Sequence, residues 1–294
     1  MTIISPSDAE RANGHLSQES VQIGRQAILR DGFVILRGVV DPSHCRMLRD
    51  KALEDLPRLL ARTDAPFNFT RSNVQQDWPT TSPYLFRDVL VNDFAIQVTK
   101  SVLGSGLTCP FYSGNTALAN TMQRQPVHAD MGHLWPAQEQ TNPDVIGVTP
   151  PYALVVNVIL VDTDARNGST ELWPGTHLDP SCAIQDGDIK IADEVLAARA
   201  KVAPPIQPEV KAGDILIRDI RLWHAGMPNT TDEPRPMLAM IHWVSWWMHS
   251  WRPRFAREAQ PMLEHADLRW LVEFTDEDVD HVMLSHAYDV KDDE

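Results

Sequence analysis

The sequence has few cysteines and no long hydrophobic run. Cys45, Cys109 and Cys182 are scattered and show no Cys-x-x-Cys spacing, which excludes the disulfide scaffold of a small secreted domain and indicates reduced thiols. No apolar stretch approaches the roughly 20 residues of a membrane span. The N-terminus also lacks the basic and apolar regions of a secretory signal. We therefore expect a cytoplasmic protein without membrane insertion.

Basic side chains are also scarce. The formal net charge of the 294 residues is −14, and no run is rich in Lys or Arg. Nucleic acids and anionic membrane surfaces bind basic patches, so we expect neither as a partner. The chain contains no linker, internal repeat or low-complexity block. We therefore expect one domain over residues 1–294.

The N-terminal third of the chain shows mainly helical patterns. Residues 1–16 are polar and aperiodic, so we expect a mobile tail. Residues 17–104 are predicted to form a helical support that includes one short apolar strand. The stretch 62–82 is irregular and aromatic, which fits either a surface loop or the wall of a binding site. In this third, we expect helices from Ser17 to Arg30, from Asp41 onwards and from Asn92 to Leu103, and a strand at 33–36.

Strand patterns dominate residues 107–246. Short apolar segments alternate there with Pro, Gly, Asn and Asp, with a single helical interruption near 187–201. This pattern predicts a mainly β protein with flanking helices and a double-sheet β fold. Beyond Arg254 we expect a helical C-terminal extension over 254–287. The predicted strands of the jelly-roll core are 107–113, 116–122, 125–130, 152–162, 169–173, 206–210, 214–219 and 236–246.

His128 and Asp130 form a His-x-Asp pair on one of these predicted strands. Side chains alternate along a strand with period two, so both point to the same face. A distant histidine such as His224 would complete a site of two imidazoles and one carboxylate, which suits non-haem Fe(II). His-x-Asp alone is common by chance, so the prediction depends on the surrounding motifs.

Several motifs follow in a fixed order. Gly32–Val39 follows the first helix, and the His-x-Asp pair comes next. A turn Asn167-Gly168-Ser169-Thr170 precedes Pro174-Gly175-Thr176-His177, and Gly213-Asp214 leads into an apolar strand. Arg235 lies eleven residues after His224. In this order the chain resembles the phytanoyl-CoA dioxygenase family of Fe(II)/2-oxoglutarate oxygenases over roughly residues 20–247. Within that family it is most similar to compact fungal enzymes that oxidise terpenoids and meroterpenoids.

The resemblance implies a jelly-roll (cupin-like) fold and a set of site residues. His128, Asp130 and His224 would bind Fe(II). Arg235 would pair with the distal carboxylate of 2-oxoglutarate, a task suited to a planar cation. Gln125 and Thr170 would lie near the other end of this cosubstrate, and O2 would be the second cosubstrate.

The resemblance also limits the reaction. Related halogenases carry a small residue where this chain has Asp130, which leaves room for a halide. The carboxylate therefore implies hydroxylation, desaturation or rearrangement. A homodimer is also implied.

The expected substrate is a bulky, apolar small molecule. Aromatic loops around Phe67, Asn68 and Trp135 would contact it, as would Ile241 on the strand that begins near Arg235. That strand also presents Met237, Ala239 and Trp243 on the same face. One alternative is an acyl-CoA hydroxylase, although the phosphates of CoA would favour a basic pocket mouth. Another is a non-catalytic double-sheet protein that binds a metal or small ligand, although such a site has no need of Arg235.

Other polar residues in apolar surroundings have simpler explanations. His133 lies five residues after His128, a spacing that turns it to the other face of a strand. His177 is predicted to brace its turn, and His242 to pack among tryptophans. Asn157 interrupts an apolar strand and either faces the cavity or bonds to backbone.

Overall fold

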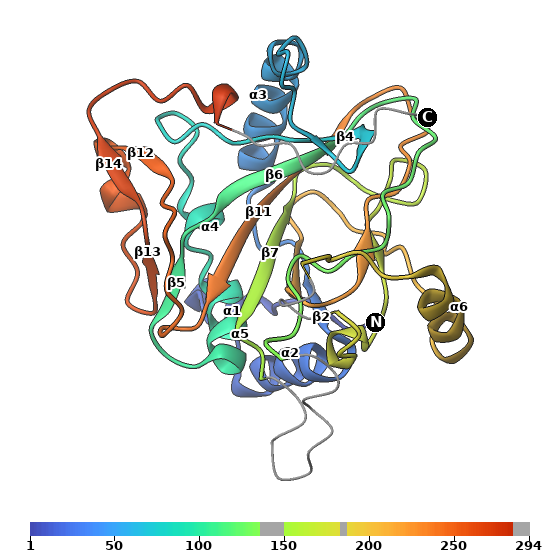
Figure 1. Ribbon diagram of the computed structural model, residues 1–294. Helices are drawn as coiled ribbons and strands as arrows, with labels where there is room; N and C mark the ends of the chain where they lie inside the picture. The colour runs from blue at the N-terminus through green and yellow to red at the C-terminus, as the bar shows by residue number, and fades with distance from the viewer. Residues whose placement is uncertain (136–149, 183–186, 285–294) are drawn as a thin grey trace.

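The computed structural model describes residues 1–135, 150–182 and 187–284, and its largest element is a ten-stranded sheet (Figure 1). The strand order is β1-β2-β9-β7-β11-β6-β4-β3, with β5 added beside β11 and β13 beside β5. The strands are β1 (Ile3–Ile4), β2 (Phe33–Leu36), β3 (Phe67–Asn68), β4 (Thr70–Gln75), β5 (Leu107–Cys109), β6 (Tyr112–Ala117), β7 (Ala153–Ile159), β9 (Ile215–Asp219), β11 (Arg235–Trp243) and β13 (Leu268–Trp270).

A second, smaller sheet faces the inner side of the large one. Its strands β8 (Glu171–Leu172) and β10 (His224–Ala225) are antiparallel. Isolated bridges join His128 to His224 and Leu172 to Ile206, which extends this layer on both sides. Two facing sheets with these connections form the expected double-stranded β-helix. The predicted fold class is therefore confirmed.

Helices cover the outer face of the large sheet. In Figure 1, α2 and α5 lie below the strands, whereas α6 lies at the side, away from β7 and β11. The helices are α1 (Asp8–Asn13), α2 (Gln18–Asp31), α3 (Pro42–Leu60), α4 (Arg87–Leu90), α5 (Asp93–Leu103) and α6 (Asp193–Val202), with 3-10 turns at Thr176–Leu178, Arg257–Met262 and His281–Met283. The predicted helices that start near Ser17, Asp41 and Asn92 are confirmed.

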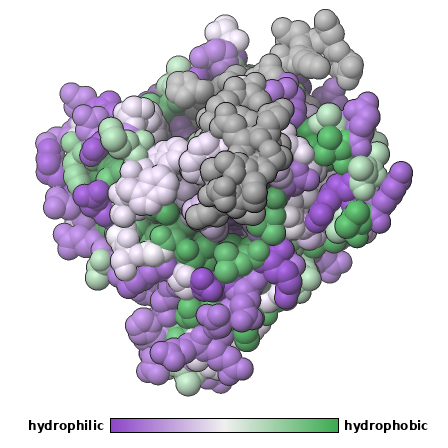
Figure 2. Space-filling view, turned by 60° about the horizontal axis from the view of Figure 1, so that its bottom comes forward, coloured by the Kyte–Doolittle hydropathy of each residue, from purple (hydrophilic) through white to green (hydrophobic). Residues whose placement is uncertain are grey.

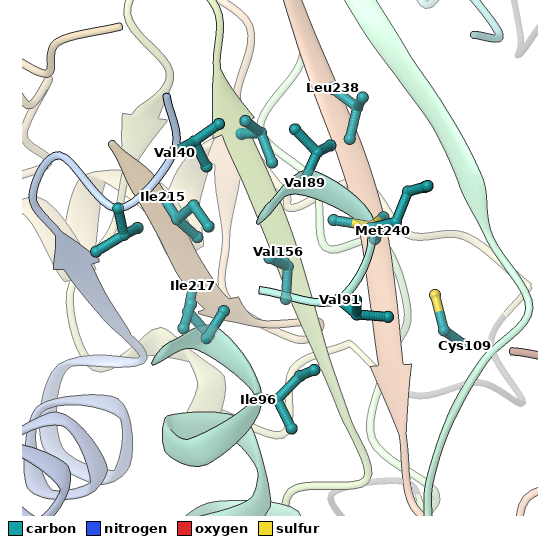
Figure 3. Close-up of a cluster of buried hydrophobic side chains, with 14 of the residues drawn as sticks. Val40, Val89, Val91, Ile96, Cys109, Val156, Ile215, Ile217, Leu238 and Met240 are labelled. Atoms are coloured by element: carbon teal, nitrogen blue, oxygen red, sulfur yellow. The ribbon is translucent and has the colours of Figure 1, made fainter. Parts of the chain in front are cut away.

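The main hydrophobic core lies between this helical layer and the sheet. Every residue of β7 is buried because the helices cover one face and the second sheet faces the other. Figure 3 shows side chains of β7, β9 and β11 packed against α4 and α5 and the segment between them. The labelled members are Val40, Val89, Val91, Ile96, Cys109, Val156, Ile215, Ile217, Leu238 and Met240. Burial of these aliphatic groups anchors the strands whose opposite face carries the polar site.

The surface is largely polar. On the face in Figure 2, hydrophilic side chains form most of the outline, in keeping with the high charge, and hydrophobic ones gather in patches near the middle. Among the described residues, no helix combines the length and the apolar content that a membrane span requires.

The expectation of a mobile N-terminal tail is wrong. Residues Ile3–Ile4 pair in parallel with β2, and Ile4 is buried. Ser7 and Glu10 form a capping box that starts α1. Such reciprocal caps satisfy backbone N–H groups at a helix start, and they stabilise helices too short to form alone.

The stretch 62–82 is not a loop throughout, because β3 and β4 extend the large sheet next to β6. Residues 125–130 are less regular than expected, since only His128 forms ladder bridges there. The helix predicted near 187–201 is α6, which begins later, at Asp193.

The predicted helical extension over 254–287 is also wrong for the part described. Residues 254–284 form β12 (Arg254–Ala256), β13, β14 (Glu273–Thr275) and two 3-10 turns. Pro253 and Pro261 disfavour a continuous helix. Instead, the rings of Phe255 and Trp270 pack on Tyr112 at centroid distances of 5.4 and 6.0 Å. Tertiary packing therefore overrides the apparent helical pattern.

His242 gives the fold a pH dependence. The side chain is 2 % exposed, and its Nδ1 lies 2.9 Å from the Thr99 hydroxyl. Burial, with a smaller contribution from His265, lowers the pKa of His242 from 6.5 to about 3. The folded state thus favours the neutral ring. The contribution of neutral His242 to the free energy of unfolding is fully present above the unfolded pKa of 6.5. It is lost as the pH falls below that value, by about 1.4 kcal/mol per pH unit.

We expect His242→Gln to reduce this acid sensitivity. Between pH 7.5 and about pH 5, the free energy of unfolding of the wild type should fall by about 2 kcal/mol more than that of the variant. Urea denaturation at both pH values measures the difference. Parallel losses in the two proteins would contradict a neutral His242 in the folded state.

Candidate active site

The second sheet brings together the three predicted metal ligands. His128 and His224 are bridge partners, and their ring centroids are 4.3 Å apart. Asp130 follows two residues after His128, and its Oδ1 lies 3.5 Å from His224 Nε2. Donor atoms of the three side chains all lie within 4.8 Å of one another. This spacing fits one shared metal ion.

Backbone contacts orient both imidazole rings. Nδ1 of His128 lies 2.8 Å from the carbonyl oxygen of Pro126, and Nδ1 of His224 lies 3.0 Å from that of Leu222. A carbonyl oxygen can only accept, so each Nδ1 carries the hydrogen and each Nε2 keeps a free lone pair. Metal-binding histidines have this arrangement. The donor set therefore fits a metal that accepts two nitrogens and one carboxylate, such as non-haem iron.

The electrostatic environment keeps these groups in their metal-binding forms. Burial, together with the neighbouring His224, lowers the pKa of His128 to about 3, so its ring is neutral at physiological pH. Burial alone would raise the pKa of Asp130, but the attraction of the Arg218 guanidinium outweighs it and holds that pKa well below its usual range. The carboxylate is therefore ionised without a bound metal.

Arg235 begins β11 and reaches the same cavity. It is 4 % exposed, and its Nη2 donates to the carbonyl oxygen of Gly168 at 2.6 Å, with a weaker bond from Nε to that of Asn167 at 3.4 Å. Burial lowers its pKa to about 10. Among the described residues, no carboxylate forms an ion pair with it. Burying an uncompensated charge is costly, so this guanidinium is suited to an anionic ligand.

Gln125 and Thr170 both line the cavity. The Gln125 amide donates to the carbonyl oxygen of Asn68 at 2.9 Å and accepts from the backbone N–H of Gly226 at 2.7 Å. A Cβ at position 226 would lie 2.5 Å from Gln125 Oε1, so this close approach requires glycine. Gln125 thus joins the end of β3 to the residue that follows β10. Contact of Gln125 and Thr170 with the cosubstrate stays a prediction.

One cavity of about 320 Å³ contains all of these groups. Its polar lining residues include Arg235, Gln125, Thr170, Asn73, Gln75 and Asn115, and its apolar lining residues include Phe111, Met131, Val155, Ile220, Ile241 and Trp243. The alternation of side chains along β11 explains part of the apolar lining, because alternate residues of a strand share a face. Met237, Ala239, Ile241 and Trp243 all line the cavity, as the alternation predicts.

Two of the four residues expected near the substrate lie elsewhere. Asn68 and Ile241 line the cavity, but Phe67 packs with the hydrophobic cluster around Leu59 and Val74. Trp135 is 47 % exposed and is absent from the cavity wall. Sequence alone could not place Phe67, because the backbone reverses direction between β3 and β4 at Phe69, whose φ is +62°.

Phe69 and Arg218 are cavity residues that the sequence did not single out. The Phe69 ring packs against that of His128, with their centroids 4.4 Å apart. Arg218, on β9, forms an ion pair with Asp130, with Nη2 and Oδ2 2.7 Å apart. The aromatic content of 67–69 was a signal for the first. No local pattern marks Arg218, because its partner Asp130 is 88 residues away in the sequence.

The remaining polar residues are mostly structural. Asn157 faces the cavity, where its Oδ1 accepts from Arg218 Nε at 3.3 Å. His133 is buried and absent from the cavity wall. His177 Nε2 lies 3.2 Å from the carbonyl oxygen of Leu29, which braces its turn as predicted.

Known proteins resemble this chain in sequence and in fold. The family model described as phytanoyl-CoA dioxygenase matches residues 28–237. A dioxygenase of Aspergillus fumigatus, af480, is 26 % identical over 185 residues, which are 60 % of this chain and 52 % of that protein. The chain therefore spans about half the length of this curated relative.

Solved structures show the same fold. AviO1 from Streptomyces viridochromogenes Tue57 has a TM-score of 0.56 and 20 % identity, over 80 % of this chain and 99 % of that one. EctD from S. alaskensis, solved with 2-oxoglutarate and 5-hydroxyectoine, has a TM-score of 0.58 and 17 % identity, over 88 % of each chain. At these identities the likeness concerns the fold.

Proposed function

This chain belongs to the phytanoyl-CoA dioxygenase family of non-haem Fe(II)/2-oxoglutarate enzymes, and from that premise we propose that it oxidises a bulky, apolar small molecule. The proposal rests on one observation: three side chains able to hold a metal line the same cavity as a buried arginine that pairs with no carboxylate among the described residues. A protein that only stores or displays a metal has no use for such an arginine. The reaction would be a hydroxylation, desaturation or rearrangement.

Each part of the centre then has a task. Nε2 of His128 and of His224 and one oxygen of Asp130 hold the metal. Arg235 binds the distal carboxylate of 2-oxoglutarate through two parallel N–H donors. With Fe(II), 2-oxoglutarate and O2 bound, the centre couples decarboxylation of the 2-oxo acid to succinate with oxidation of the substrate. Phe69 shields His128 from solvent, which strengthens the electrostatic contacts inside the site.

The cavity wall supports an apolar substrate. Many of its lining residues are aliphatic or aromatic, and Ile241 and Trp243 lie near the end of β11. The charged side chains of the described wall are Asp130, Arg218 and Arg235. Arg218 pairs with Asp130, which leaves no basic cluster in this wall for the phosphates of CoA. A terpenoid or meroterpenoid therefore fits better than an acyl-CoA.

Succinate production tests the proposal. Purified protein with Fe(II), ascorbate and 2-oxoglutarate is incubated with terpenoid candidates and, in parallel, with phytanoyl-CoA. We expect succinate formation to rise with an apolar candidate, together with a product heavier by one oxygen or lighter by two hydrogens. Stimulation by acyl-CoA alone would refute the apolar substrate class. No succinate under any condition would refute the enzymatic function.

A further inference from the structure

Asp130 presents its two carboxylate oxygens to different partners. Oδ1 lies 3.5 Å from His224 Nε2, on the side of the other metal ligands. Oδ2 lies 2.7 Å from Arg218 Nη2, within the range of a charge-assisted hydrogen bond. One oxygen is therefore directed at the metal position, while a fixed cation binds the other.

Arg218 is itself held in place from the opposite side. Its side chain is 7 % exposed, and its Nε donates to Asn157 Oδ1 at 3.3 Å. Arg218 and Val155 are register partners on the central strands β9 and β7, whose outer face packs in the main core. Asp130 is joined to the turn after β9, because its N–H donates to the carbonyl oxygen of Ile220 at 3.1 Å. The guanidinium therefore sits on the rigid part of the fold.

The division of the two oxygens matters for coordination. A carboxylate can bind a metal through one oxygen or through both. With one donor atom from each of three side chains, half of an octahedral shell stays open, enough for a chelating 2-oxo acid and O2. A second oxygen from Asp130 would occupy a position that one of these needs.

We propose that Arg218 is a positioning residue that keeps Asp130 to a single metal-binding oxygen and so preserves the open coordination position. The inference rests on the proposed function, since it concerns the same metal. In this proposal Arg218 is not itself a metal ligand and acts through its ion pair with Asp130. This role depends on the placement of the Arg218 guanidinium as well as on its charge, because the hydrogen bond to Asn157 fixes the direction in which the guanidinium points.

The effect of Arg218→Met follows from this role. Methionine is of similar length and carries no charge, so Oδ2 of Asp130 becomes free to turn to the metal. We expect coupled turnover, the rate at which succinate forms together with oxidised substrate, to fall about 10–100-fold. This range is typical for loss of a partner that orients a metal ligand. Affinity for Mn(II) should change by less than about tenfold, because the second oxygen compensates for the lost orientation. Arg37→Met, which removes the Arg37–Asp214 ion pair near the start of β9, is the matched control and should leave both quantities unchanged.

The coordination itself is measured without turnover. Crystals of the wild type and of Arg218→Met are prepared with Mn(II) and 2-oxoglutarate, and Co(II) absorption spectra report the coordination number in solution. The wild type should show Asp130 bound through one oxygen, with Arg218 on the other, and Arg218→Met should show both oxygens on the metal.

Two results would overturn the proposal: a wild-type Asp130 bound through both oxygens, or an Arg218→Met protein with unchanged coordination and coupling. The first result is measured on the wild type alone, so the proposal can be tested even if Arg218→Met fails to fold. Absence of Mn(II) from the triad would refute the proposed function and this inference together, whereas metal bound with a two-oxygen Asp130 would refute this inference alone.

Discussion

His128→Ala is expected to abolish turnover and to remove iron from the protein while the fold survives. In the proposed centre the side chain would supply one of the two nitrogen ligands found among the described residues, and its Nδ1 contact with Pro126 is local. Loss of a group that merely orients a metal ligand costs about 10–100-fold in affinity, so loss of the ligand should exceed that range. Fe(II) content after desalting and succinate release measure the two effects, and circular dichroism checks the fold.

His133→Gln is the matched control for this variant. His133 is buried five residues further along the chain, and within the described part of the chain neither of its ring nitrogens has a hydrogen-bond partner. It lies outside the cavity wall, so the control should retain iron and turnover. If His128→Ala kept its iron, or if the two variants lost it equally, His128 would not be a ligand.

Arg235→Lys is expected to weaken the binding of 2-oxoglutarate about 10–100-fold while Fe(II) binding is unchanged. A single ammonium cannot reproduce two parallel N–H donors, and a hydrogen bond to a charged group contributes about 1.5–3 kcal/mol. The lysine would also leave the carbonyl oxygens of Asn167 and Gly168 without their present donor. The apparent KM for 2-oxoglutarate and its Kd from anaerobic titration measure the effect.

Arg166→Lys serves as the control, because Arg166 precedes the same Asn-Gly-Ser-Thr turn but is exposed and pairs with Asp164. It should bind 2-oxoglutarate like the wild type. An unchanged cosubstrate dependence in Arg235→Lys would show that the carboxylate binds elsewhere.

The sequence predicted the centre where local rules apply. His128 and Asp130 share a face because strand side chains alternate, and the same rule placed Met237, Ala239 and Ile241 in one row. Arg235 was assigned through the resemblance to a family, and the structure places it in the same cavity as the triad. The double-sheet β fold followed from short apolar segments separated by turn residues, and the jelly roll from the resemblance.

Contacts between distant segments could not be predicted in this way. The apolar strand around Arg218 gives no sign that its guanidinium meets Asp130. The positive φ of Phe69 turns this ring onto His128 and leaves Phe67 in a different cluster. Residues 1–16 looked unstructured because their order depends on pairing with β2. In each case the deciding partner is far away in the sequence.

Anaerobic addition of 2-oxoglutarate to the Fe(II)-loaded protein tests the central claim most directly. Chelation of a 2-oxo acid at ferrous iron produces a visible charge-transfer band, which binding at any other place does not. The band should appear and saturate in the wild type, require more 2-oxoglutarate in Arg235→Lys, and be absent in His128→Ala. If both Fe(II) and 2-oxoglutarate bind to the wild type but no band appears, the triad and Arg235 do not form one oxygenase centre.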